Sequence, residues 1–279
     1  MTGVAVLAML ALVGCGTSSR QAVAPAPTDP ATPTTMATSP SPTVSPTPRR
    51  TTAKPPPKAR RYVPTSPAAK PKATKKSTTL LVERLHGVGD AKQVVSVVAN
   101  GYGSSYATLQ AFTKTSSGWK RTFGPWSARV GRKGFAPPGD KREGDLRTPS
   151  GSYGFGFMFG VRSNPGVRYE YRRVTGDWHV WADDPPTPRY NLWTDTRTQD
   201  GGPTPESMNQ VPAYNYSAVI AYNTSRAPGM GSAIFLHVST SGSTAGCVSL
   251  PTGQLLDVMR WLDSSKRPRI IMGTESYVT

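Results

Sequence analysis

The chain changes composition sharply near residue 80, and this change limits which part of it can form a packed core. Residues 16–79 hold 14 of the 28 prolines, and their only aromatic residue is Tyr62. Such a segment cannot bury enough apolar surface to offset the entropy cost of ordering it. We therefore expect a disordered, partly polyproline II tether over residues 15–79, followed by one folded domain over residues 80–279.

Most of the positive charge belongs to the predicted tether. It holds 11 of the 33 basic residues and only one acidic residue, Asp29, which gives +10 of the formal net charge of +17. A basic protein can bind nucleic acid, but these basic residues are not interleaved with aromatic ones apart from the single Tyr62, so we expect no nucleic-acid partner. Attraction to anionic cell-wall polymers or lipid head groups fits better. The alternative is that the charge only keeps the tether soluble and extended.

The first fourteen residues are uncharged and largely apolar, and Cys15 follows them. The apolar stretch is too short to span a bilayer and suits the core of a signal peptide. Leu12-Val13-Gly14-Cys15 resembles a bacterial lipobox, which implies cleavage before Cys15 and a diacylglyceryl group on its sulfur. The alternative is an ordinary cleaved signal peptide. Both interpretations predict export, and the lipobox implies anchoring of the mature chain to the outer face of the bacterial cell membrane, within reach of the cell wall.

Short runs of β-type residues, separated by Gly, Pro and Asn clusters, predict a mainly β domain. One helix is expected from Thr252 to Asp263, capped by Thr252. Strands do not alternate with long helices, which argues against a parallel α/β sheet. We expect a sandwich or irregular barrel with a few short helices, in which residues 80–130 belong to the same sheet as the rest. The apolar face of the helix should comprise Leu255, Leu256, Met259 and Leu262. The expected strands are 93–99, 106–114, 119–123, 127–130, 217–222, 233–238, 247–250 and 269–272.

Cys247 and His237 are the strongest candidates for chemistry. Cys247 is the tenth residue after His237, and the segment between them is mostly small and polar, as in a loop. Two strands joined by such a loop can lie about 5 Å apart, within reach of a thiol–imidazole contact. A neighbouring histidine is a common way to generate a reactive thiolate. The alternative is that Cys247 is a small buried apolar residue and His237 a satisfied core histidine.

Several segments, taken in order, resemble the L,D-transpeptidase catalytic domain, the YkuD-like enzymes of bacterial cell walls. The similarity covers about residues 131–273, roughly half of the chain. The segments that carry it are Gly131-Arg132-Lys133-Gly134-Phe135, Gly144-Asp145-Leu146-Arg147-Thr148-Pro149-Ser150-Gly151, Asp183-Asp184-Pro185, Tyr190-Asn191, Gly231 to His237, and Thr244-Ala245-Gly246-Cys247-Val248.

The resemblance implies a thioester mechanism on peptidoglycan stem peptides. Cys247 would attack the carbonyl of an L-centred residue at position three, and His237 would act first as base and then as acid. Backbone N–H groups around Gly246 and Cys247, in the site loop that begins at Thr244, would stabilise the oxyanion. An amine acceptor would give a cross-link, and water would give a carboxypeptidase. The histidines show no metal-site spacing, so we expect no metal and no cofactor, and we expect a monomer.

The chain departs from the common signature of the family at two points. Thr244 and Ala245 stand where a Ser-His pair is usual, and Ser249 occupies the position of an arginine. The missing carboxylate-binding cation could be supplied by Arg142, Arg147 or Arg189. Asp145 and Arg147 could instead be structural and fix the loop before Thr148.

Four further residues are candidates for substrate contact, each with a structural alternative. Trp178, with His179 and Trp181 nearby, could line a groove or pack in the core. Tyr190 and Asn191 could hold a stem peptide or make a turn. Ser249 could contact substrate at the position of the family arginine.

Other classes of protein remain as alternatives. A catalytically silent wall-binding lipoprotein could keep this fold without a reactive thiol. A papain-like hydrolase places its cysteine before its histidine in the chain, the reverse of the order here. A sortase-like enzyme needs an arginine after the cysteine and a more distant histidine. Both cysteine-enzyme classes fit this chain less well.

Overall fold

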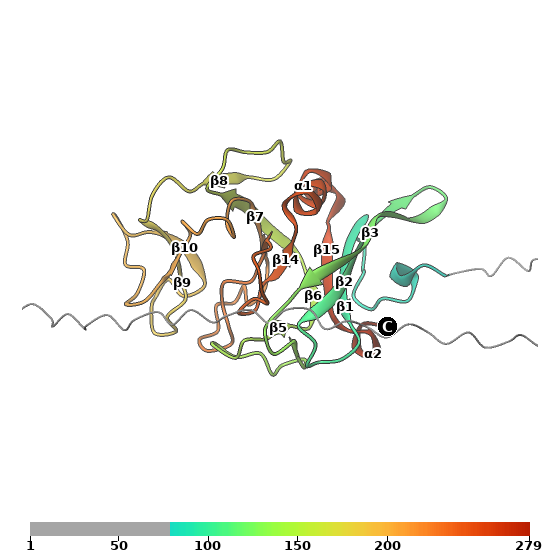
Figure 1. The fold of residues 1–279 in the computed structure, drawn as a ribbon, viewed down its shortest axis with the longest axis horizontal. Helices are drawn as coiled ribbons and strands as arrows, with labels where there is room; N and C mark the ends of the chain where they lie inside the picture. Colours follow the sequence, from blue (N-terminus) through green and yellow to red (C-terminus); the bar gives the residue numbers. More distant parts are fainter. Residues whose placement is uncertain (1–78) are drawn as a thin grey trace, which may run out of the picture. The chain divides into compact units, whose positions relative to one another are not determined.

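The computed structural model describes residues 79–279, and this part of the chain is mainly β. Strands form one large curled sheet and two small ones, and helices are few and short (Figure 1). The mainly β fold expected from the sequence is thus confirmed. The signal peptide predicted for residues 1–14, the lipidation of Cys15 and the tether, except its last residue, lie outside the described residues.

The elements of the described part are short, and most are strands. The strands are β1 (Gln93–Ala99), β2 (Tyr106–Thr115), β3 (Gly118–Arg129), β4 (Phe135–Ala136), β5 (Thr148–Pro149), β6 (Gly151–Tyr153), β7 (Phe155–Gly160), β8 (Tyr171–Arg173), β9 (His179–Ala182), β10 (Leu192–Asp195), β11 (Glu206–Ser207), β12 (Ser217–Ile220), β13 (Phe235–Val238), β14 (Val248–Leu250) and β15 (Arg269–Thr274). The helices are α1 (Thr252–Trp261) and α2 (Glu275–Val278), with 3-10 turns at Leu81–Glu83 and Ser264–Lys266.

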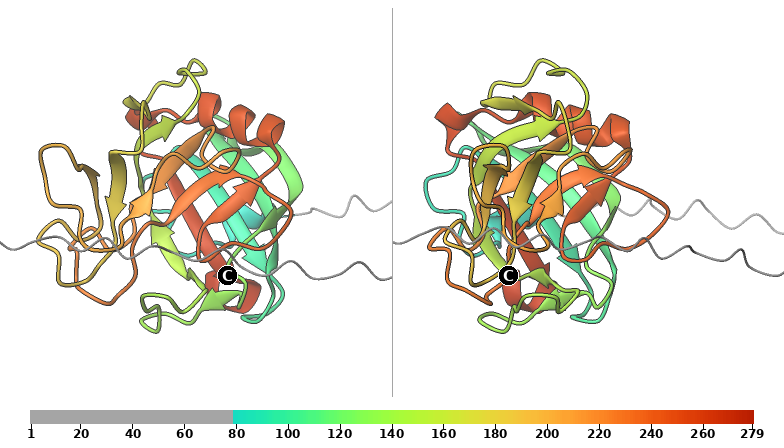
Figure 2. Two further views of the ribbon diagram at one scale, coloured as in Figure 1. Left: turned by 60° about the vertical axis from the view of Figure 1, so that its left-hand side comes forward. Right: turned by 90° about the vertical axis from the view of Figure 1, so that its left-hand side faces the viewer.

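The large sheet has ten strands in the order β6-β15-β1-β2-β3-β14-β13-β12-β7-β8. β6 and β7 are consecutive in the chain, yet β6 pairs with β15 at one end of the sheet and β7 pairs with β12 near the other. Only Gly154 separates these two strands, so the segment 151–160 draws the two ends of the sheet together. The result is the curled, barrel-like sheet of Figure 2, which has β1, β2 and β3 in the same layer as β13 and β14.

The core lies inside this curl and is closed on one side by α1. Leu255, Val258 and Met259 are fully buried, and the helix packs against β13 and β14. The end of α1 is held by the buried Gln93, whose amide donates to the carbonyl of Trp261 at 2.8 Å and accepts from the N–H of Asp263 at 2.9 Å. Satisfying both groups lets the chain leave the helix inside the protein without orphaned backbone polar atoms.

The bounds and pairing of several elements differ from those expected from the sequence. The strands expected at 119–123 and 127–130 are one strand, β3, because β2 pairs along nearly its whole length and absorbs the irregularity at Gly124 as register shifts. Thr252 does not cap α1: Pro251 is the N-cap, no side chain caps it, and the helix ends at Trp261 rather than Asp263. Val258 belongs to the buried face, whereas Leu256 is only partly buried.

Strands β7 to β11 were not among the expected strands, although Phe155, Phe157 and Phe159 alternate along β7. Strands β8 to β11 are each two to four residues long, too short to show a clear period. Their pairing is a product of tertiary contact: β7 is held between β12 and β8, and β9 between β10 and β11. Within residues 79–279, the helices lack the length and apolar character that a membrane span requires.

Truncating Leu255 to alanine should lower the free energy of unfolding by about 2–5 kcal/mol, because a fully buried leucine leaves a cavity between α1 and the sheet. The matched control is Leu256→Ala in the same helix, which should cost about 1 kcal/mol or less since that side chain is partly exposed. Denaturant titration of both variants measures the difference. Equal losses would contradict the placement of α1.

Candidate active site

Cys247 and His237 come together because two neighbouring strands run parallel. β13 carries His237 and Cys247 directly precedes β14, with Leu236 paired to Val248. Side chains alternate along a strand, so His237 shares a face with Phe235, which packs beside Cys247, while Leu236 and Val248 point into the core of the large sheet. Thiol and imidazole both line one cavity of about 410 Å³. The predicted side-by-side placement of these two strands is confirmed.

The Cys247 thiol is buried and hydrogen-bonded to backbone. Its Sγ accepts from the N–H of Phe235 at 3.3 Å and donates to the carbonyl of Ala233 at 3.2 Å. A donated S–H means that the sulfur carries its proton in this structure. The structure records no hydrogen bond between this sulfur and His237 among the described residues. The thiol proton therefore has to leave the Ala233 carbonyl before the imidazole can accept it.

His237 is held in the tautomer that a general base requires. Its Nδ1 lies 2.9 Å from the carbonyl oxygen of Val238. A carbonyl only accepts, so Nδ1 carries the hydrogen and Nε2 keeps a free lone pair. Burial lowers the pKa of His237 to about 4, against a smaller opposite effect of the Val238 bond. The imidazole is therefore neutral at physiological pH and able to accept a proton.

Burial also raises the pKa of the Cys247 thiol well above its ordinary value, and the nearby Glu206 carboxylate adds to the rise. The N–H of Phe235 and the ammonium of Lys141 act in the opposite direction but are weaker. Resting thiol and imidazole are thus both neutral, not a thiolate–imidazolium pair. Such a pair can react only if proton transfer accompanies attack on a bound carbonyl.

Three segments singled out from the sequence meet at the turn before Cys247. The Thr148 hydroxyl accepts from the N–H of Gly131 at 2.9 Å and donates to the Cys247 carbonyl at 3.3 Å. The Thr244 hydroxyl donates a hydrogen bond to the same carbonyl at 2.7 Å, and the Thr244 backbone N–H donates to the Val130 carbonyl at 3.0 Å. Segments near 131, 148 and 244 thus position Cys247 together.

Gly246 is required at its position by close approach. A Cβ there would lie 3.0 Å from the Arg147 carbonyl and 3.2 Å from the Ile234 side chain. Its N–H, expected to serve as an oxyanion donor, instead donates to the Thr244 hydroxyl at 3.2 Å. That N–H would have to exchange this bond for a substrate oxygen, because an N–H donor with one hydrogen cannot satisfy both acceptors well.

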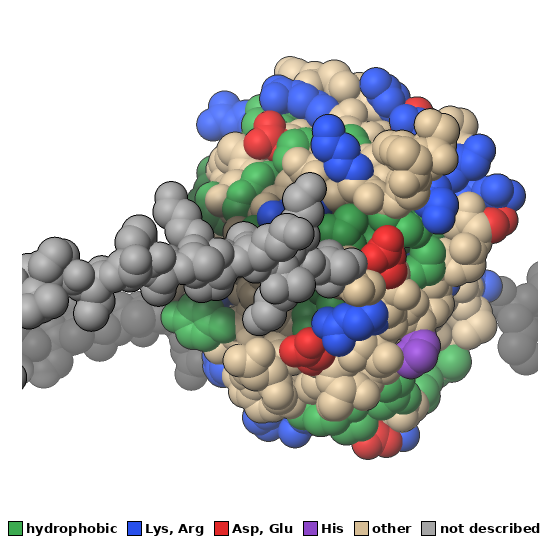
Figure 3. Space-filling model, turned by 90° about the vertical axis from the view of Figure 1, so that its right-hand side faces the viewer, with side chains coloured by type: hydrophobic (Ala, Val, Ile, Leu, Met, Phe, Trp, Pro, Cys, Tyr) green, Lys and Arg blue, Asp and Glu red, His purple; other side chains and the backbone are tan. Residues whose placement is uncertain are grey.

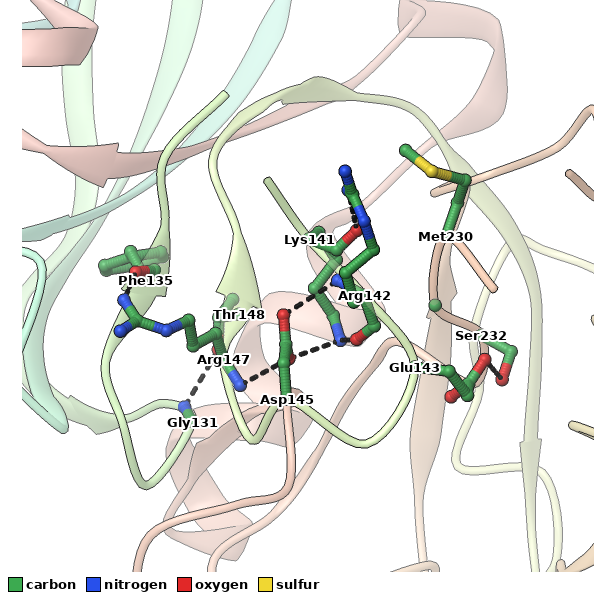
Figure 4. Close-up of polar contacts among 12 residues, drawn as sticks. Gly131, Phe135, Lys141, Arg142, Glu143, Asp145, Arg147, Thr148, Met230 and Ser232 are labelled. Atoms are coloured by element: carbon green, nitrogen blue, oxygen red, sulfur yellow. Dashed lines mark hydrogen bonds and ion pairs between the residues drawn. The ribbon is translucent and has the colours of Figure 1, made fainter. Parts of the chain in front are cut away.

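Lys141 is the cation of the cavity, and the sequence analysis missed it. Its ammonium donates to Asp145 at 2.7 Å and to the Arg142 carbonyl at 2.6 Å, and its side chain is 6% exposed (Figure 4). Asp145 also accepts from the backbone N–H groups of Arg142 and Arg147. The expectation that Asp145 fixes this loop is confirmed. The burial that distinguishes Lys141 exists only in the folded chain, so no local pattern in the sequence marks it.

None of the three arginines proposed to replace the family arginine lines the cavity. Their guanidinium groups are used by nearby carbonyls and a hydroxyl: Arg142 donates to Gly139 and Lys141, Arg147 to Phe135, and Arg189 to Trp193 and Thr194. Each closes its own loop, which is why none reaches the thiol.

The four weaker substrate-contact candidates also lie outside the wall of the cavity. Trp178 packs under Arg197, 4.6 Å from the ring centre. Tyr190 is buried and donates to Glu143. Ser249 is buried in β14 and accepts from the Ser239 hydroxyl at 3.1 Å. Asn191 is buried, and its side chain makes hydrogen bonds inside the protein.

Asn191 supports the backbone that holds the thiol. Its Oδ1 accepts from the Trp181 indole at 2.9 Å and from the N–H of Ala233 at 3.2 Å. Its Nδ2 donates to the carbonyls of Tyr222 and Asn223. Asn191 and Ala233 both have positive φ, 58° and 52°. Asparagine adopts this conformation fairly readily, whereas alanine does so only when its surroundings enforce it. Asn191 thereby positions the carbonyl that binds the Cys247 thiol.

A group of carboxylates faces the thiol across the cavity. Burial raises the pKa of Glu206 to about 7, and the neighbouring Asp183 contributes. Burial raises the pKa of Asp183 to about 6, with smaller contributions from Asp184 and Glu143. Glu143 is held by Tyr190 and by Ser232, the latter at 2.9 Å (Figure 4). Among residues 79–279, no three His, Cys, Asp or Glu side chains are grouped to hold a metal ion.

The surface of the domain shows no concentrated basic stripe in the view of Figure 3, where Lys and Arg side chains are spread around the face. Residues 80–279 carry 22 basic and 15 acidic side chains.

Comparison with known proteins adds little to what the structure itself shows. No family model matches the chain, and no curated protein matches it. One solved structure is similar, the helical cell shape determining protein Pgp2 from Campylobacter jejuni, at 15% identity and a TM-score of 0.32. The match covers 70% of this chain and 54% of that one, so the chain spans about half the length of that protein. A TM-score this low carries no argument about function.

Alkylation of Cys247 by iodoacetamide should be slow at pH 7 and should rise about tenfold per pH unit up to pH 9 without a plateau. The thiolate is the reacting form, and its fraction grows tenfold per unit below a raised pKa. Peptide mapping by mass spectrometry follows the modification at Cys247 separately from Cys15. A plateau near pH 7 would contradict the neutral resting pair.

Replacing Asn191 with alanine should lower the free energy of unfolding by about 2–4 kcal/mol, because two buried donors lose their acceptor. The exposed Asn100 offers a matched control, since Asn100→Ala should change stability by less than about 0.5 kcal/mol. Denaturant unfolding measures both. A small effect at Asn191 would show that it is not a structural hub.

Proposed function

We propose that this protein is a peptidoglycan L,D-transpeptidase that acts through a thioester on Cys247. The observation that carries the proposal is the shared cavity of Cys247 and His237, formed by the parallel strands β13 and β14. The order of the surrounding segments, which resembles the YkuD-like enzymes, supports it further. The convergence of Thr148 and Thr244 on the Cys247 carbonyl explains why those segments stand together.

The first half-reaction forms the thioester. The stem peptide enters the cavity with the carbonyl of its third residue above Sγ. As sulfur forms its bond to that carbon, the thiol proton passes to Nε2 of His237, and the carbonyl oxygen becomes an oxyanion. The carbon–nitrogen bond then breaks, and the imidazolium returns the proton to the departing amine of the terminal D-amino acid.

The second half-reaction releases the enzyme. An amine from a second stem attacks the thioester, gives its proton to His237, and forms the cross-link as the sulfur leaves and regains its proton. Water in place of the amine would make the same site an L,D-carboxypeptidase. Neutral His237 suits both halves, because it must accept a proton in each before it can donate one.

Burial of the thiol favours reaction only with a bound substrate. A thiol that is neutral in the free protein is protected from adventitious oxidation, since susceptibility follows thiolate character and exposure. A substrate that enters the cavity supplies the carbonyl toward which the negative charge moves. No metal or other cofactor takes part in the proposed steps.

We place the enzyme at the cell envelope. The lipobox-like sequence before Cys15 supports a lipid anchor on the outer face of the membrane, and the basic, Pro-rich segment after it supports reach into the anionic wall. The proposed partners are stem peptides and the membrane, with a monomeric catalytic domain.

One observation favours a second candidate, a catalytically silent wall-binding lipoprotein. The raised pKa of Cys247 and the bond of its thiol to Ala233 are what a structural cysteine would also show. The two candidates differ in whether Cys247 forms an acyl adduct.

Exposure of the protein to a carbapenem should add the mass of one drug molecule at Cys247, because the resemblance implies that such β-lactams acylate this thiol. Cys247→Ala should abolish the adduct. His237→Ala should slow its formation by about 10²–10⁴-fold, the usual contribution of a general base. Intact-protein mass spectrometry measures all three.

A folded protein that gives no adduct with a carbapenem, and no thioester with a stem tetrapeptide, would overturn the enzymatic proposal and favour the silent domain. Where the tetrapeptide reacts, muropeptide analysis separates the acceptors: a cross-linked dimer indicates an amine, and a free tripeptide indicates water.

A further inference from the structure

The segment from Glu206 to Tyr214 is tied to the end of β13 that carries His237. The N–H of Val238 donates to the carbonyl of Ala213 at 3.1 Å, and the N–H of Val161 donates to that of Tyr214 at 2.9 Å. The segment is therefore held between β13 and the end of β7. Its last residue, Tyr214, is 4% exposed and lines the cavity with the thiol and the imidazole.

The ring of Tyr214 meets the imidazole of His237 at right angles. The two ring centres are 5.5 Å apart and the planes cross at 87°, an edge-to-face contact that constrains the side chain to one orientation. The same tyrosine ring packs at 5.6 Å against both Phe159 and Phe235, also edge to face. His237 is thus held by its Nδ1 bond on one side and by an immobilised aromatic ring on another.

Glu206 immobilises that ring. The Tyr214 hydroxyl donates to Oε1 of Glu206, and the side chain of Gln210 donates to the same oxygen at 3.2 Å. These contacts tie the start of the segment to its end. Burying a carboxylate costs free energy even when it is hydrogen-bonded, so an apolar contact would serve stability at least as well. The Tyr–Glu pair is therefore not explained by packing alone.

We propose that Tyr214 is a positioning residue for His237, and that Glu206 acts through Tyr214 by anchoring its hydroxyl. The proposal rests on the proposed function, because it assigns His237 the role of general base. Tyr214 keeps the Nδ1 hydrogen on the Val238 carbonyl and Nε2 directed into the cavity. An imidazole that rotates out of this geometry can no longer accept the thiol proton. A misplacement of about 1 Å can lower the rate about a hundredfold.

The charges that face Glu206 come from several elements of the cavity. Asp183 follows β9, Glu143 and Lys141 belong to the loop before β5, and Cys247 precedes β14. Only Lys141 is cationic, and Asp145 already pairs with it. Removing the charge of Glu206 while keeping an oxygen acceptor, as in Glu206→Gln, should leave the ring anchored and should ease ionisation of the thiol.

The test compares Tyr214→Leu and Tyr214→Phe in the full chain, with Tyr216→Leu as the matched control, a partly buried tyrosine two residues away that packs in the other cluster. Tyr214→Leu removes the ring that meets the imidazole and should slow carbapenem acylation at saturation by about tenfold to a hundredfold, with little change in the half-saturating concentration. Tyr214→Phe keeps the ring and should restore most of the rate, to within about threefold. Tyr216→Leu should match the wild type.

A second readout separates positioning from mere stability. Nitrogen-15 NMR of His237 should show one neutral tautomer, with hydrogen on Nδ1, in the wild type and in Tyr214→Phe. In Tyr214→Leu it should show a mixture of tautomers and a pKa that moves from about 4 toward the ordinary 6.5. Glu206→Gln should keep the single tautomer and raise the rate of iodoacetamide alkylation at pH 8 at least about threefold, since its charge raises the pKa of the thiol.

Unchanged tautomer and saturating rate in a folded Tyr214→Leu variant would overturn the proposal and leave Tyr214 a packing residue. Failure of the proposed function would look different: the wild type would form no adduct, while the NMR comparison would still report whether Tyr214 orients the imidazole. A Tyr214→Leu variant that does not fold moves the test to Tyr214→Met, which also removes the ring that meets the imidazole, with Tyr214→Phe beside it. The proposal then requires the second tautomer in Tyr214→Met but not in Tyr214→Phe, and a single tautomer in both would overturn it.

Discussion

The parallel pairing of β13 with β14 is the constraint on which the candidate site depends. In this register Phe235 and His237 share one face of β13 beside Cys247, and Leu236 and Val248 share the other. If β14 slipped by one residue against β13, the thiol would point into the core of the large sheet while the imidazole stayed on the opposite face. The register is fixed because the apolar partners fill the inside of the curled sheet, so the same pairing both packs the core and places Cys247 beside the cavity.

Placing a thiol and an imidazole in a buried cavity has an electrostatic cost. Burial opposes charge on both the thiol and the imidazole, and this protein keeps both neutral in the resting state. Reactivity must then come from geometry: a fixed tautomer, a carbonyl that holds the thiol, and a turn whose carbonyl is bound by Thr148 and Thr244. Tyr214 and Glu206 add to this fixed geometry, because the Tyr214 ring meets the imidazole edge to face and its hydroxyl donates to Glu206.

The sequence analysis predicted the parts of the site that local patterns encode. The thiol, the imidazole and the small polar loop between their strands are adjacent in the chain, so their proximity followed from strand pairing. Asp145 was offered as a residue that fixes the loop before Thr148, and its bonds to Lys141 and to two backbone N–H groups do this. Asn191 and Ser249 were weak candidates for substrate contact, Asn191 with a turn as its alternative; in the structure Asn191 bonds four surrounding groups and Ser249 lies buried in β14. Lys141, Glu206 and Tyr214 carry no local signature, since what distinguishes them is the cavity they line.

The sequence by itself determined that residues 80–279 would be mainly β and that Cys247 would lie near His237, because side-chain alternation and turn chemistry are local properties. It determined the composition of residues 16–79 and hence the expectation of a tether. Only the tertiary structure decided how the sheet closes through β6 and β7, and which charged groups face the thiol. Those contacts join residues tens of positions apart, and burial, which sets their pKa values, exists only once the chain has folded.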